Sequence, residues 1–194
     1  VRFGRPSLED AIAVPDKVFH PQFAAVFASA PLEMQHLLYL SFMEWLLFDH
    51  ALDDEGGTVA DLYHKRKKLL MPGLQKRILA ILRETAMDLY EVKDVYPGKG
   101  MVLRRVDGGE TVNVVEVIGS RQLKRAMFLA CRLCLFDGVH RIAGGVYNFK
   151  PKLRPELEKV IARLLEQGER QGRHWRECFS LEMFGLWVEK YVRS

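Results

Sequence analysis

The stretch Ala126–Phe149, AMFLACRLCLFDGVHRIAGGVYNF, decides the fold class of this chain. It holds two runs rich in β-branched and aromatic residues, Ala126–Phe136 and Val139–Phe149, which are typical of strands. Between them stands Asp137-Gly138, a dipeptide that favours a two-residue hairpin turn because both positions tolerate a positive φ. The stretch therefore predicts two long antiparallel strands joined by a tight turn.

This hairpin also determines which side chains share a face. Successive side chains of a strand point to opposite faces, so Cys131 and Cys134 cannot share a metal ion or a disulfide despite their C-x-x-C spacing. The tight turn places His140 at the edge of the core, on the face of Cys131. The opposite face carries Arg132, Cys134 and Arg141. We interpret that face as a modest basic platform for a ligand.

Three further β-rich runs precede the hairpin: Tyr90–Tyr96, Met101–Val106 and Thr111–Ile118. The turn signals Pro97–Gly100 and Asp107–Glu110 separate them. Short strands that follow one another this closely are typical of a meander that closes on itself. We therefore predict a small antiparallel five-stranded β-barrel of the SH3-like or OB-like kind.

Helical periodicity flanks the barrel on both sides. Upstream, a helix is expected from Pro31 to about His50, the capping-box pattern Thr58–Asp61 begins a second helix, and Pro72 begins a third. Downstream, a helix from Pro155 to about Gln167 precedes a last helix. The predicted fold class is α+β, with an N-terminal helical region over residues 1–89, the barrel over 90–150 and two C-terminal helices over 151–194 that pack on the same unit.

The last helix is unusually aromatic. Its apolar arc is wider than one packing face needs, and it holds Trp175, Phe179, Met183, Phe184, Trp187 and Tyr191. Two interpretations stay open. The helix is clamped between the helical layer and the barrel, which we favour, or it forms the seam of a homodimer.

Composition places the chain among globular, cytoplasmic proteins. Its 194 residues are 48% hydrophobic, which suffices for a core, and no window approaches the run of apolar residues that a membrane span needs. The start of the chain lacks the layout of a signal peptide. The three cysteines are an odd number, which fits reduced thiols. We expect no membrane crossing and no disulfide.

Charge is distributed in two blocks around residue 64. The segment 41–63 contains acids and no Lys or Arg, whereas 64–83 contains bases and no acid. The blocks neutralise one another on solvated faces, or the basic block faces phosphates. Under the second interpretation, the candidate nucleic-acid contacts are Lys65, Arg66, Lys67, Lys68, Lys76, Arg77, Arg132 and Arg141.

One acidic turn invites a metal hypothesis. Asp49, His50 and Asp53 lie close in sequence, and His64 follows on the next predicted helix. The spacing matches neither the calcium loop nor a zinc motif such as His-Glu-x-x-His, so we favour a solvated turn. Nucleotide-binding and hydrolase motifs are missing as well, and the sequence predicts no cofactor and no catalytic residue.

Two segments carry a family resemblance: Phe42–Asp49, FMEWLLFD, and Leu89–Val92, LYEV. Over roughly Leu40 to Pro151 the chain resembles a group of poorly characterised bacterial proteins that often carry SEC-C zinc-binding tails. The resemblance implies a fold and supplies no catalytic residues. The chain departs from that group because Cys178, near His174, lacks the further ligands of a four-coordinate zinc site.

From these observations we expect a non-catalytic binding module that uses the barrel face and the basic helical hairpin. Its partner would be nucleic acid or another protein. The alternative is a scaffold or homodimer that forms through the aromatic last helix. A metal-dependent hydrolase centred on the acidic turn is the third hypothesis.

Overall fold

The computed structural model describes residues 30, 32–52, 57–67, 69–167 and 173–191. Three helices precede the barrel: α3 (Leu32–Phe48), α4 (Val59–Lys67) and α5 (Gly73–Glu84). The strands are β1 (Met87–Tyr96), β2 (Gly100–Arg105), β3 (Thr111–Val115), β4 (Phe128–Phe136) and β5 (Val139–Phe149), with a short 3-10 turn η1 (Gly119–Arg121) before β4. A second such turn, η2 (Pro151–Leu153), leads into α6 (Arg154–Gln167) and α7 (Arg173–Tyr191).

The predicted capping box begins α4. The Thr58 backbone N–H donates to Asp61 Oδ2 at 2.9 Å, and the Asp61 N–H donates to Thr58 Oγ1 at 3.2 Å. This reciprocal pair satisfies two backbone donors that the first helical turn leaves without partners. Helix α5 begins directly after Pro72, as the sequence predicts. None of the helices that the model describes combines the length and the apolar character needed to span a membrane.

The five strands close into a barrel in the order β1-β2-β3-β5-β4. Neighbouring strands pair antiparallel, except that β3 and β5 run parallel and meet at Val114 and His140. The fold class is confirmed, although the barrel is mixed rather than wholly antiparallel. This strand order is that of an OB-like barrel, which decides between the two barrel types that the sequence left open.

The β4–β5 hairpin has the predicted register, with Phe136 opposite Val139 and Cys134 opposite Arg141. Both turn residues adopt positive φ, 51° at Asp137 and 76° at Gly138, as a primed hairpin turn requires. A bulge then interrupts β5 between the partners of Cys131 and Arg132.

The cysteines lie where the strand alternation places them. Cys131 is buried inside the barrel with Val92, Met101 and Leu103, whereas Cys134 points outward and lies 3.5 Å from Thr85 Oγ1. The low-dielectric surroundings of Cys131 raise the pKa of its thiol. All three cysteines are free thiols. The C-x-x-C spacing therefore creates neither a disulfide nor a shared metal position.

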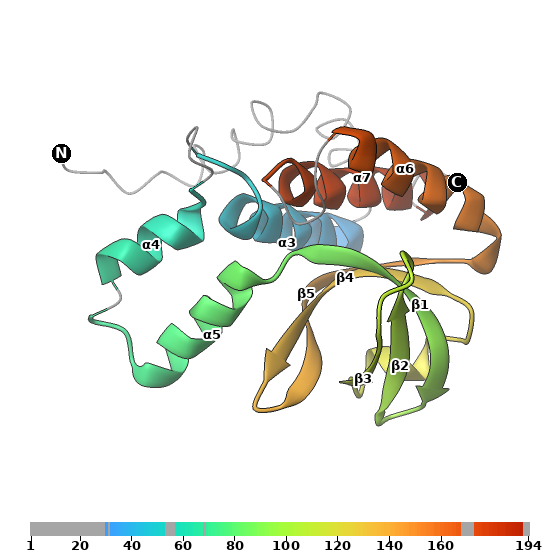
Figure 1. The fold of residues 1–194 in the computed structure, drawn as a ribbon, viewed down its shortest axis with the longest axis horizontal. Coiled ribbons are helices and arrows are strands. Elements are labelled where there is room, and N and C mark those ends of the chain that lie inside the picture. The colour runs from blue at the N-terminus through green and yellow to red at the C-terminus, as the bar shows by residue number, and fades with distance from the viewer. Residues whose placement is uncertain (1–29, 31, 53–56, 68, 168–172, 192–194) are drawn as a thin grey trace.

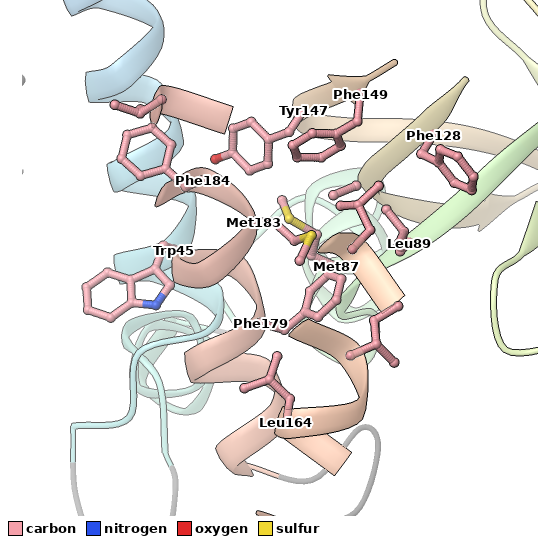
Figure 2. Packing of buried hydrophobic residues seen from close by; sticks show 14 of the residues in the cluster. Trp45, Met87, Leu89, Phe128, Tyr147, Phe149, Leu164, Phe179, Met183 and Phe184 are labelled. Carbon is pink, nitrogen blue, oxygen red and sulfur yellow. The ribbon is translucent and has the colours of Figure 1, made fainter. Parts of the chain in front are cut away.

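A larger core lies outside the barrel, between its β1-β4-β5 wall and the helices α3, α6 and α7 (Figure 1). Figure 2 shows Phe179 and Met183 of α7 directed at Met87 and Leu89 of β1, with Phe184 of the same helix beside the barrel wall. Helix α7 also contacts α3, α6 and β5. The prediction that the aromatic helix is clamped between the helical layer and the barrel is confirmed.

Candidate functional site

The barrel has one outer face that helices cover and one that they leave open. The covered wall is β1-β4-β5, where the outward side chains Leu89, Phe128 and Phe149 are buried under helices. The open face belongs to β2 and β3, on the side of the barrel away from the helical layer (Figure 1). Its outward side chains Thr111 and Asn113 on β3 are exposed. Among the described residues, this second face is the barrel surface that the helices leave accessible to a ligand.

The basic hairpin α4–α5 projects beside the barrel (Figure 1). The charged side chains predicted there are exposed, with Lys68 outside the described residues: Lys65, Arg66, Lys67, Lys76 and Arg77. Arg77 forms an ion pair with Asp137 and lies 4.5 Å from the ring centroid of Phe136. These contacts hold α5 against the β4–β5 turn, so the hairpin and the barrel present their charges together.

Arg132 corrects the prediction of a basic platform. Its side chain has 0% exposure, and groups from α3, from the residue after α3 and from the α5–β1 junction surround its guanidinium. Its guanidinium donates to Asp49 Oδ1 at 2.8 Å, to Glu44 Oε1 at 3.2 Å and to the Thr85 carbonyl. A buried and fully engaged arginine cannot contact phosphate, so Arg141 alone remains exposed on the predicted platform.

The acids around Arg132 complete a buried polar network that joins four elements. Glu44 Oε2 accepts the Gly145 N–H at 2.5 Å, and Asp49 Oδ2 accepts the Ser180 hydroxyl at 2.8 Å. Burial raises the pKa of Glu44, although the Gly145 N–H and the charge of Arg132 oppose that shift. A cavity of about 10 Å³ lies beside Glu44 and Ser180, which is space for a single water. The network fastens α3 and α7 to the barrel wall.

The candidate metal ligands are engaged elsewhere. Asp49 belongs to the network just described, the ring of His50 packs on Trp45 with centroids 4.6 Å apart, and His64 Nδ1 lies 2.7 Å from Arg83 Nη1. Asp53 lies outside the described residues. Within the part of the chain that the model describes, no three His, Cys, Asp or Glu side chains are grouped to hold a metal ion.

Sequence analysis missed a second basic cluster, which we call the basic rim and which consists of Lys99, Arg121, Lys124 and Arg125. All four side chains are exposed, and none forms an ion pair with a residue that the structure describes. Tyr96, half exposed, stands at the end of β1 beside the rim. The four basic residues of the rim belong to two separate turns, so they do not form a continuous run of charge in the sequence. The signal that could have found them is R-x-x-K-R at 121–125.

Backbone contacts bring the two turns of the basic rim together. The Gly98 N–H donates to Ser120 Oγ at 3.0 Å, and the Glu116 N–H donates to the Lys99 carbonyl at 3.4 Å. Ser120 is buried and also donates to the Val117 carbonyl, so it ties the β1–β2 turn to η1. The rim therefore lies on a braced end of the barrel.

A groove opens next to the basic rim, between β5 and the segment that connects β3 to β4. Its volume is about 360 Å³, within the range of small-ligand sites. Apolar side chains form its walls, and Glu116, Gln122 and Asn148 are among its polar lining residues. Arg121 and Lys124 of the rim flank Gln122 and Leu123 in sequence, so the groove and the rim share one loop.

Comparison with known proteins places the chain in a family without assigning an activity. No curated protein and no protein of known structure shows significant similarity to it. One family model matches residues 36–186, from α3 through most of α7. That match says nothing about SEC-C tails, so this part of the resemblance stays a prediction. The chain belongs to the family of unknown function DUF7986.

Proposed function

We propose that this protein is a non-catalytic module that binds single-stranded nucleic acid across the open β2–β3 face of its barrel. One observation carries the proposal: the barrel has two groups of exposed basic side chains near the face that the described helices leave uncovered. The basic rim lies at the end formed by the β1–β2 turn, and the α4–α5 hairpin lies at the β4–β5 turn. A polyanion that contacts both groups would meet positive charge at each of them.

The basic side chains of β1 and β2 contribute less charge, because acids pair with them. Arg104 of β2 and Lys93 of β1 both pair with Glu91, at 3.2 and 3.0 Å. Burial alone would raise the pKa of Glu91, but the hydrogen bonds and charges of Lys93 and Arg104 together lower it. Phosphate contacts are therefore expected mainly at the basic rim and the α4–α5 hairpin, with Tyr96 available to stack on a base.

The dimensions suit a short single strand. The five residues of β3 span roughly 17 Å at about 3.3 Å per residue, which sets the scale of the open face. Barrels of this kind bind about 4–16 nucleotides. A single strand of this length is thus long enough to cross the open face.

Fluorescence anisotropy with a labelled oligonucleotide over a salt series tests the proposal. The rim variant changes Arg121, Lys124 and Arg125 to alanine, and the hairpin variant changes Lys65, Lys67 and Lys76. A matched control removes three exposed charges from α6 and the turn before it: Lys152, Lys159 and Arg163. Since each lost phosphate contact lowers the slope of log K against log salt by about 0.7, the rim variant should lose about 2 from that slope.

The control variant should bind as the natural protein does. Circular dichroism and thermal melting establish that each variant is folded. The proposal is wrong if the natural protein fails to bind at low salt, or if the control loses as much affinity as the rim and hairpin variants.

A further inference from the structure

We infer that the groove beside the basic rim receives one unstacked base of the bound strand and prefers a base with an amino group. This inference rests on the proposed function and deepens it, because it assigns a base-selective position to a module whose other contacts are with phosphates.

The groove exists because β3 and β5 part early. Their parallel pairing is confined to Val114 and His140, after which β3 ends at Val115 while β5 continues to Phe149. The edge of β5 beyond this point faces the loop 116–123 instead of a strand. The barrel stays closed through this short contact, and the free edge of β5 beyond it borders the groove.

The walls of the groove suit a flat, partly apolar group. Ile142 and Val146 of β5 form one side, and Ile118 and Leu123 of the connecting loop form part of the other. Ile118 is 76% exposed, which is unusual for an isoleucine and leaves its apolar surface available to a ligand. A nucleobase between these walls would bury apolar surface on both of its faces.

The polar lining favours hydrogen-bond donors on the ligand. Glu116 Oε1 accepts the backbone N–H groups of Ile118 and Gly119 at 3.0 and 2.9 Å, which fixes the carboxylate at the groove. Its Oε2 accepts no hydrogen bond from the described part of the chain. A carboxylate oxygen accepts from the amino groups of cytosine, adenine or guanine, whereas thymine and uracil have no amino group and their one N3–H lies between two carbonyl oxygens that repel the carboxylate.

Charge complementarity points to a nucleic acid rather than an uncharged ligand. The loop that lines the groove also carries Arg121 and Lys124, whose charges would hold the phosphates on either side of an inserted base. The acidic Glu116 inside the groove complements a nucleobase that donates hydrogen bonds. The basic Arg121 and Lys124 on its border complement the negative phosphate of the same nucleotide.

The test compares oligo-dC and oligo-dT of about 12 nucleotides, a length within the site size of such barrels. We expect the natural protein to bind oligo-dC about tenfold more tightly, the discrimination of one good base contact. Glu116→Gln keeps an acceptor for the two backbone N–H groups but loses the charge, and it should reduce the preference to about twofold or less. Ile118→Ala should weaken binding of both oligonucleotides, whereas Leu165→Ala, an exposed leucine on α6, should not.

The outcomes separate this inference from the proposed function. Equal, salt-dependent binding of both oligonucleotides, unchanged by Glu116→Gln, would overturn the base pocket and leave the phosphate-binding face intact. Absence of binding to either oligonucleotide at low salt would overturn both.

Discussion

An arginine on the covered face of the barrel is buried, whereas an arginine on the uncovered part of the same surface is exposed. Arg132, on the wall that α3 covers, is buried and donates to three groups. Arg141, opposite Cys134 on the neighbouring strand, is exposed. Two arginines that strand alternation places on one surface therefore differ in role, because the helices cover one and not the other. The comparison teaches that helical cover, rather than strand geometry, decides which charges can bind a ligand.

The largest expected effect comes from removing the buried arginine. Arg132→Ala would leave Glu44 and Asp49 without their cationic partner in the interior, at a cost of about 3–5 kcal/mol in the free energy of unfolding. Arg141→Ala should change it by about 0.5 kcal/mol or less. Urea unfolding of both variants measures the contrast. Similar losses for the two would show that the faces do not differ as described.

A smaller effect on stability is expected when alanine replaces either of two glycines that have nearly the same backbone conformation. Gly144 and Gly138 have φ of 75° and 76°, so alanine at either position costs about 1–2 kcal/mol from the left-handed backbone alone. A Cβ on Gly144 would stand 2.0 Å from Glu44 Oε2, whereas a Cβ on Gly138 would meet open space. Gly144→Ala should therefore destabilise the protein more than Gly138→Ala, by about 1 kcal/mol or more. Equal midpoints of thermal unfolding would refute the close contact.

The smallest expected effect is the dependence of the free energy of unfolding on pH. Burial raises the pKa of Glu44 above its usual value of 4.5, so the folded state holds this proton more tightly than the unfolded state. The stabilisation that the protonated Glu44 contributes is complete below pH 4.5, and it declines as pH rises through the raised pKa. Relative to Glu44→Gln, the natural protein should lose stability as pH rises above 4.5 and through the raised pKa. A difference between the two proteins that does not vary with pH in urea titrations would contradict the raised pKa.

Local patterns predicted most of the secondary structure. The observed β5 coincides with the predicted Val139–Phe149, and the turn at Asp137-Gly138 sets the register of the whole hairpin. The capping box Thr58–Asp61 correctly predicted the start of α4, because its hydrogen bonds form within one helical turn. Alternation, turn chemistry and capping depend on neighbours in sequence, and a single sequence displays them directly.

Features that depend on long-range packing were not predictable in this way. The burial of Arg132 depends on acids 83 and 88 residues earlier in the chain, and no local pattern shows which helix will cover a strand. The parallel contact between β3 and β5 similarly joins strands that are not consecutive. Lys99 and Arg121 form one rim because Ser120 and Glu116 join their two turns through hydrogen bonds.

The position of α7 along the chain has a consequence for biosynthesis. The barrel is complete at Phe149, yet its covered wall takes Phe179, Met183 and a hydroxyl from Ser180. While the ribosome still holds the segment after β5, Asp49 lacks its bond to Ser180, and the apolar β1-β4-β5 surface lacks that cover. Nascent chains with incomplete cores of this kind attract chaperones and aggregate. The protein thus reaches its stable form only after α7 has left the exit tunnel and docked.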